Sequence, residues 1–395
     1  MTATTSHRIV AGLALVLFGS SAAQAADAQA FGDRLKEIAA KSGVPMAFTA
    51  AEAEGENVVL TGVTLGTAPD TAEVGDLTFE TVTGSNAEGW RVATVPFEDF
   101  SKTEDGKQAN VTGMVLEGLQ IAGSQGASTL PGETQFFFDK AAVESVSVSE
   151  GGKDIFSLSG TEFTNSVASG SGTIASTFNM GDFAVDFAAL PADETTKAMQ
   201  EIGYPQLSGT GSMEMTWNPQ SGELVLDPLA ISVENAGDFS IDYQINGYTP
   251  AFAKSLAEIQ EQMAANPDAA QSSGMAIIGL VSQLSVASLS IDFTDASLTP
   301  KLLDYYAKQQ GQTRDELVAG LTGMMPMVLA SLQNPEFQAQ VTSAVETFLK
   351  DPKSLSVSID PDAPVAATQI IGAAMGAPQT LPTVLQLEVT ANGTE

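Results

Sequence analysis

The sequence has no cysteine, and its one histidine is His7, among 395 residues. The lack of cysteine excludes disulfide bonds and thiol-based redox or nucleophilic chemistry. His7 lies in a leader that we expect to be removed, so the mature chain would lack imidazole as well. Ser-His-Asp and Cys-His catalysis, His-ligated haem and the common zinc and copper sites are therefore excluded. We expect a protein that is not an enzyme, with no catalytic residue, no metal site and no cofactor.

The N-terminus has the features of a secretory signal peptide. A mildly basic start that ends at Arg8 is followed by ten apolar residues, Ile9–Phe18, and by the small residues Ala23-Gln24-Ala25. This layout predicts a signal peptide over residues 1–25, with cleavage after Ala25. The apolar run is shorter than the roughly 20 residues that span a bilayer, and no later run reaches 18 apolar residues. We expect an exported protein without a transmembrane anchor, most simply in a periplasm.

Basic residues are scarce: 16 Lys and Arg stand against 48 Asp and Glu, which gives a net charge of −32 at pH 7. Loss of Arg8 with the leader would leave 15 against 48, a charge of −33. Such a field repels phosphates, which argues against nucleic acid as a partner and against electrostatic binding to an anionic membrane. The acidic segments 292–295 and 360–362 do not match a calcium-binding loop, and we interpret them as solvated turns.

Strand signals dominate the first half of the chain. Runs rich in Val, Thr and Phe alternate with period two, and turn residues separate them without helical crossovers. After a helix at 27–41, this pattern predicts antiparallel strands at 58–65, 77–82, 90–97, 111–121, 135–148, 155–163 and 174–187.

Strands and helices alternate after residue 190. The predicted strands lie at 209–217, 224–233, 239–245, 288–293, 355–359 and 384–390. The predicted helices lie at 191–202, 250–264, 274–284, 300–308, 313–332, 335–350 and 366–375, and Pro326 is expected to kink or divide one of them. The fold class is therefore α+β, with a mostly antiparallel β domain at 26–190 and a mixed β and helical domain at 191–395.

The most apolar helical region supplies the candidate binding residues. Because methionine adapts to irregular ligands, this region could line a groove for an acyl chain. Its residues are Leu317, Leu321, Met324, Met325, Met327 and Phe337. Ordinary packing of an apolar helix face against the sheet explains the same residues and is the more frequent outcome.

Carboxylates are the catalytic groups that remain without His and Cys. A glycosidase needs only two Asp or Glu residues on either side of the scissile bond. Two Trp and five Tyr offer few aromatic platforms for a sugar. A carboxylate-dependent hydrolase stays open as an alternative.

Three segments of the C-terminal half carry a resemblance to known sequences. They are SLSIDFTDASLTPKLLDYYAKQQGQTRDELVAGL from Ser288, FLKDPKSLSVSIDPDAPV further on, and GYPQLSGTGSMEMTWNPQSGELVLD at 203–227. This half resembles a family of uncharacterised exported proteins of alphaproteobacteria. The resemblance implies export but no activity and no site residue. The long alternating strands are also similar in architecture to those of envelope lipid-handling proteins, an analogy of fold alone.

Three functions follow from these observations. The first is an exported, non-catalytic protein that binds an apolar small molecule, a lipid or an envelope protein. The second is a structural or interaction module of the envelope without a small ligand, and the third is the hydrolase. A continuous apolar cavity would favour the first, and a filled core the second.

Overall fold

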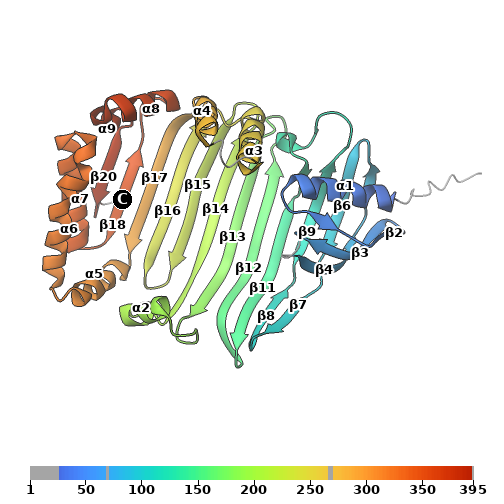
Figure 1. The fold of residues 1–395 in the computed structure, drawn as a ribbon, viewed down its shortest axis with the longest axis horizontal. Coiled ribbons are helices and arrows are strands. Elements are labelled where there is room, and N and C mark those ends of the chain that lie inside the picture. The colour runs from blue at the N-terminus through green and yellow to red at the C-terminus, as the bar shows by residue number, and fades with distance from the viewer. Residues whose placement is uncertain (1–25, 68–70, 266–269, 394–395) are drawn as a thin grey trace, which may run out of the picture.

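The computed structural model describes residues 26–67, 71–265 and 270–393, so the predicted signal peptide lies outside the described residues. The fold is α+β, as predicted, with 32% helix and 43% strand. A broad antiparallel sheet of 16 strands forms the centre, and a sheet of four strands lies over one of its ends (Figure 1). The helices lie at the ends and along the rim of the broad sheet.

The elements have the following bounds. The small sheet contains β1 (Met46–Ala47), β2 (Ala50–Glu54), β3 (Asn57–Leu65) and β4 (Ala72–Phe79). The large sheet contains β5 (Thr83–Ser85), β6 (Gly89–Pro96), β7 (Phe100–Glu104), β8 (Lys107–Thr112), β9 (Val115–Ala122), β10 (Phe136–Phe137), β11 (Lys140–Glu150), β12 (Lys153–Val167), β13 (Ile174–Asp186), β14 (Gln206–Asn218), β15 (Glu223–Val233), β16 (Gly237–Asn246), β17 (Ser285–Asp295), β18 (Ser354–Ile359), β19 (Val365–Ala366) and β20 (Leu387–Ala391). The α-helices are α1 (Ala28–Lys41), α2 (Glu194–Ile202), α3 (Pro250–Ala265), α4 (Ala270–Val281), α5 (Leu298–Gln309), α6 (Arg314–Val328), α7 (Pro335–Lys350), α8 (Ala367–Gly376) and α9 (Leu381–Val384). Short 3-10 helices are η1 (Pro131–Glu133), η3 (Leu329–Leu332) and η4 (Pro378–Thr380).

Neighbouring strands of the large sheet mostly follow one another in the chain. From β11 to β18 each strand pairs with the next, and β20 closes this edge beside β18. The sheet runs across the predicted boundary at residue 190, because β13 pairs with β14 from Ile174 opposite Trp217 to Asp186 opposite Gln206. The chain on both sides of that boundary therefore contributes to one sheet.

Two predicted strands are each divided in the structure. The strand expected at 111–121 forms β8 and β9, which are separated at Gly113. Gly113 has a φ of +62°, and a Cβ atom there would lie 2.6 Å from the Cβ atom of Glu144. The expected strand at 135–148 forms β10 and β11 with a short connection between them. The chain does not reverse at either break, because β8 and β9 both run antiparallel to β11, and β10 and β11 both run antiparallel to β9. Period-two alternation detects the strand residues but not a short interruption within them.

The N-terminal helix α1 packs between the small sheet and one end of the large sheet. Asp27 caps its first turn. Phe31 is fully buried and meets the rings of Phe79 and Trp90 edge-on, at centroid distances of 5.0 and 5.7 Å. The same cluster contains Val58 of β3. One hydrophobic core therefore joins both sheets here.

At the opposite end, α6 and α7 form a helical hairpin. The predicted capping box is present, because the side chains of Thr313 and Glu316 each accept a hydrogen bond from the other's backbone N–H. The helix α6 continues through Pro326 to Val328, and the chain then tightens into η3. Phe337 of α7 packs against Val389 of β20, which attaches the hairpin to the sheet edge.

The buried side chain of Arg34 fastens α1 to the large sheet. Its guanidinium donates to the carbonyl oxygens of Ala122 and Gly123, both at 2.8 Å, and to Glu37 at 2.7 Å. We expect Arg34→Met to destabilise the protein by about 2–4 kcal/mol, because one buried and one partly buried carbonyl oxygen lose their hydrogen-bond donor. Thermal unfolding and hydrogen exchange of α1 measure this loss.

Lys41→Met is the matched control for Arg34→Met. It removes an exposed ion pair with the same Glu37, at 2.7 Å, and should cost no more than about 0.5 kcal/mol. Equal effects of the two substitutions would contradict the role assigned to Arg34.

Candidate apolar ligand surface

One row of paired residues crosses ten strands of the large sheet and is apolar throughout. Directly opposed residues of antiparallel strands point to the same face, so this row defines what we call the apolar face. From β9 to β20 its members are Leu116, Ala141, Phe163, Phe178, Met213, Leu229, Ile241, Ile291, Val357 and Val389. A second row on this face contains Gly211, Ile231, Phe239, Phe293 and Leu355.

The opposite face is polar along the same strands. One of its rows contains Glu162, Asn179, Ser212, Ala230, Ser240, Asp292, Ser356 and Thr390. Another contains Ser159, Asp182, Thr210, Ser232, Asp238, Thr294 and Ser354. The sheet is therefore amphipathic from β12 to β18, with hydrocarbon on one side and hydroxyl and carboxyl groups on the other.

An irregular position keeps the apolar face continuous along β13. On β13, Phe178 and Phe183 both belong to this face although they are five residues apart, which strict alternation would not allow. The register shifts at Gly181, which has a φ of +72° and leaves no room for a side chain, since a Cβ atom would lie 1.8 Å from the carbonyl oxygen of Ser159. Such a bulge moves the following side chains back to the same face.

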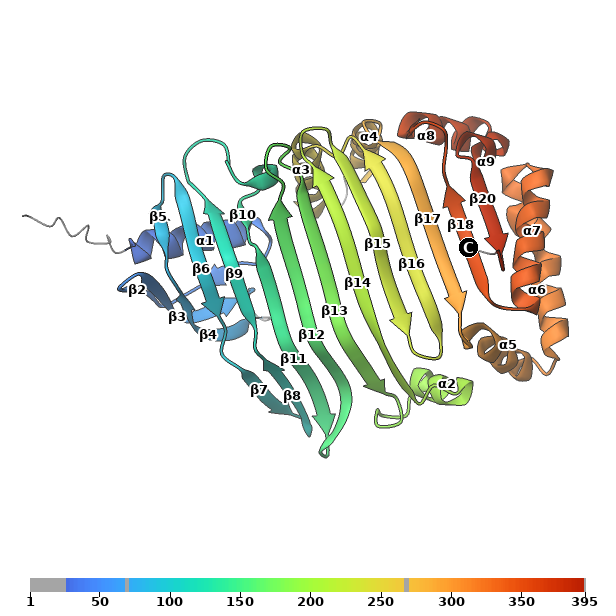
Figure 2. The ribbon, with the colours of Figure 1, turned by 180° about the vertical axis from the view of Figure 1, so that it is seen from behind.

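Helices cover the apolar face at both ends and along one rim. At the C-terminal end, Phe348 of α7 meets Phe293 of β17 edge-on at 6.1 Å between ring centroids. Along the rim, Phe252 of α3 contacts Tyr248, whose ring meets Trp217 of β14. In Figure 1 the helices α1, α3 and α4 all lie in front of the sheet, and in Figure 2 they lie behind it. The apolar face is therefore the one turned to the viewer in Figure 1.

The middle of the apolar face has no second layer among the described residues. Below α3 and α4, no helix or strand crosses β12–β16 in Figure 1. Leu229 is 41% exposed, and Ile231 and Phe239 are each 37% exposed. The three buried hydrophobic clusters of the described ranges lie near the two ends of the sheet, not here. Exposed contiguous apolar surface of this kind is typical of binding sites.

An apolar hollow lies on this face beside the N-terminal cover. It has a volume of about 310 Å³ and is lined by Phe97, Met114, Val115, Leu116, Ala141, Ala142, Val143, Thr161 and Phe163. Three of these residues begin the apolar row, so the hollow opens onto the uncovered middle. Beyond the hollow, the ring centroids of Phe163 and Phe178 are 6.5 Å apart.

Two polar side chains on the apolar face are hydrogen-bonded to each other. Ser176 of β13 is buried and donates to the side-chain oxygen of Asn165 on β12 at 2.7 Å. The amide of Asn165 donates in turn to the carbonyl oxygen of Phe138 at 3.0 Å. They therefore offer little hydrogen-bonding capacity to a ligand.

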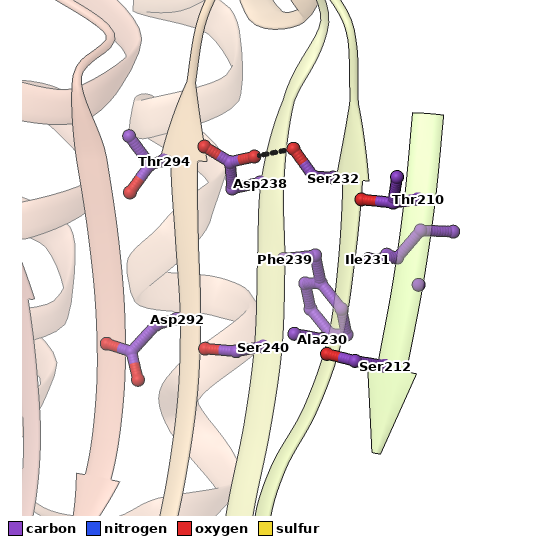
Figure 3. Close-up of a pocket in the computed structure, with 11 residues that line it drawn as sticks. Thr210, Ser212, Ala230, Ile231, Ser232, Asp238, Phe239, Ser240, Asp292 and Thr294 are labelled. Atoms are coloured by element: carbon purple, nitrogen blue, oxygen red, sulfur yellow. Dashed lines mark hydrogen bonds between the residues drawn. The ribbon is translucent and has the colours of Figure 1, made fainter. Parts of the chain in front are cut away.

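The polar face has a shallow hollow of about 300 Å³ over β14–β17 (Figure 3). Hydroxyl and carboxyl groups line it, among them Thr210, Ser240 and Asp292, and the Ser232 hydroxyl donates to Asp238. This face is open to the viewer in Figure 2, with no described helix in front of it. Its groups are solvated rather than enclosed.

A pair of carboxyl groups meets on the polar face next to this hollow. Burial, a hydrogen bond with Asp227 and the charges of Asp227 and Asp292 raise the pKa of Asp242. The raised pKa favours the protonated form of Asp242 beside these two acidic side chains. Within the described part of the chain, no group of three or more His, Cys, Asp or Glu side chains is placed to hold a metal ion.

The structure does not gather the six predicted binding residues around one groove. Leu317 is buried in a cluster with α5, Phe337 in another with β20, and Met325 packs against the latter. Leu321, Met324 and Met327 point outward, with exposures of 37%, 54% and 81%. The helical segment Arg314–Leu332 is the one described segment long and apolar enough to cross a membrane by length and composition. Period-two alternation marked the strands of the apolar face, but their register was needed to show a continuous surface.

Comparison with known protein families finds one model that matches the C-terminal part of the chain. Residues 230–392 match the model of a family described as "Uncharacterized protein". The match starts within β15 and includes the rest of the sheet to β20. No curated protein matches the chain.

The raised pKa of Asp242 predicts a pH-dependent stability. A carboxyl whose pKa is higher in the folded state stabilises the fold at acid pH, and this stabilisation is lost as the pH rises through the raised value. Asp242→Asn should therefore raise the melting temperature at pH 7 by roughly 1–3 °C and have little effect at pH 3.5.

Asp182→Asn is the control for Asp242→Asn, because Asp182 is exposed on the same face of β13. Melting curves from pH 3.5 to 8 separate the two variants. A gain for Asp242→Asn that is the same at all pH values would contradict the raised pKa of Asp242.

Proposed function

We propose that this protein is an exported, non-catalytic carrier that binds a lipid or another apolar ligand on the apolar face. The observation that supports this most directly is the uncovered stretch between the two ends of the sheet. There Leu229, Ile231 and Phe239 are more than a third exposed, while side chains of the same face are buried under helices elsewhere. A ligand would complete the missing layer.

The energetics favour a hydrocarbon ligand. Each square ångström of apolar surface removed from water contributes roughly 25 cal/mol, and both the ligand and the exposed side chains would gain. From β12 to β17 the face spans five inter-strand steps, about 24 Å. The hydrocarbon half-thickness of a bilayer is roughly 15 Å, so an extended acyl chain fits along the rows.

The charge of the protein favours a ligand without net negative charge. The chain has a net charge of −32, and the central residues of the apolar row, from Phe163 to Ile241, include no basic side chain. An anionic headgroup would meet repulsion without a partner. Zwitterionic or uncharged lipids are the expected class.

Binding should depend on the apolar face and not on the polar one. Ile231 and Ser232 are adjacent on β15, are both exposed and point to opposite faces. Ile231→Gln should weaken binding of a polarity-sensitive fluorescent probe several-fold, because a polar amide replaces hydrocarbon contact. Ser232→Gln should leave the affinity unchanged.

Native mass spectrometry of the purified protein tests the ligand itself. We expect adducts with the mass of a lipid that has no net charge. Solvent extraction should release this lipid from the protein. A clean unliganded mass, together with no probe binding, would contradict the proposal and favour an interaction module without a small ligand.

Export is the second part of the proposal, and it rests on the signal peptide predicted at residues 1–25. The protein recovered from the periplasmic fraction of expressing cells should begin at Ala26, as intact mass and N-terminal sequencing would show. Ala25→Leu should block cleavage, because signal peptidase requires a small residue there. Recovery of uncleaved protein from the cytoplasm alone would contradict export.

An envelope protein is a second candidate for the occupant, and exposed methionines favour it. Met327 of α6 and Met375 of α8 are 81% and 83% exposed. Asn334, just before α7, donates to the carbonyl oxygen of Gln379 in η4 at 3.0 Å, which joins the two regions. Flexible methionines suit a protein surface as well as a lipid. Crosslinking through these positions would distinguish a protein partner from a lipid.

A further inference from the structure

We infer that the apolar hollow at β9, β11 and β12 holds the terminal end of the ligand's alkyl chain, which fixes the direction in which the ligand lies. This inference rests on the proposed lipid-binding function and adds to it a defined seat and a chain-length preference. The hollow is the concave part of the face, of about 310 Å³, and it lies next to the cover formed by α1 and the small sheet.

The residues that line the hollow offer no hydrogen-bond partner to a polar group of the ligand. Thr161 is its one residue with a polar side chain, and its hydroxyl donates to the carbonyl oxygen of Met180 at 2.8 Å. The backbone around it is paired, since the N–H of Phe97 donates to the carbonyl oxygen of Met114 at 3.0 Å. A headgroup here would lose its hydrogen bonds to water without replacement, whereas a methyl end loses none.

The nearest ion pair lies on the other side of the sheet. The side chains of Lys140 and Glu162 form an ion pair at 2.7 Å. Lys140 directly precedes Ala141 and Glu162 directly precedes Phe163, so both charged side chains point to the polar face. The strands therefore separate this charge from the hollow. A chain that starts there passes the rings of Phe163 and Phe178 towards Leu229, which is 41% exposed. The polar end of the ligand then lies over the open middle, where water reaches it.

Filling the hollow tests the inference. Ala141 lines it and points to the apolar face, whereas Ala230 of β15 pairs with Ser212 and Ser240 on the polar face and does not line the hollow. The probes are lysophosphatidylcholines with decanoyl and palmitoyl chains, used below their micelle concentrations, which displace a polarity-sensitive dye. The native protein should bind the long chain at least tenfold more tightly than the short one, since each added buried methylene contributes to affinity.

Ala141→Phe should abolish this preference by weakening palmitoyl binding on the order of tenfold, with little change for the decanoyl chain. Ala230→Phe, the matched control on the polar face, should keep the preference of the native protein. An unchanged preference in Ala141→Phe overturns the inference and leaves the proposed function intact. Failure of the native protein to bind either lipid overturns both.

A measurement on the unsubstituted protein covers the case in which Ala141→Phe does not fold. A palmitoyl-length lysophosphatidylcholine with a diazirine at the chain end is bound and irradiated, and the labelled peptides are identified by mass spectrometry. Labels on Met114 and Phe163 support the inference. Labels confined to α6–α8 or to β15–β16 overturn it.

Discussion

The register of the antiparallel ladder is the constraint on which the rest of this molecule depends. The side chains of two directly paired residues point to the same face of the sheet. From Leu116 on β9 to Val389 on β20, every residue in the row is apolar. A shift of one residue in any strand would turn its apolar side chains to the polar side. The bulge at Gly181 is part of the same constraint, because it returns Phe183 to the face that Phe178 occupies.

The two ends of the sheet are stabilised differently from the middle. At the ends, Phe31 and Phe337 lie in hydrophobic clusters that resemble the core of an ordinary two-layer domain. In the middle, the ladder and cross-strand contacts, such as Phe163 with Phe178, hold strands whose apolar side remains open. Anchored ends allow such a sheet to persist, since strands need packing against another layer for independent stability. The same arrangement leaves an apolar surface of fixed shape for a ligand.

The two faces also divide the electrostatics. The acidic residues Asp227, Asp242 and Asp292 lie together on the polar side, where burial and the neighbouring charges raise the pKa of Asp242. On the apolar side, the polar side chains of Ser176 and Asn165 hydrogen-bond to each other. A hydrocarbon ligand thus meets no unpaired polar group on the central rows, and an anionic one approaches an acidic protein without a basic partner.

Local alternation, capping and composition were enough to predict the α+β class, most strand and helix positions, the capping box at Thr313 and Glu316 and the lack of thiol chemistry. The same local signals predicted binding residues on α6 and at Phe337 of α7. The folded chain divides the apolar run of α6 between buried and exposed sides, and it brings Leu116, Phe163 and Leu229, distant in sequence, into one row. Alternation marks which residues of a strand share a side. Which strands are neighbours, and which part of their common face helices leave uncovered, are set by contacts between residues far apart in the chain.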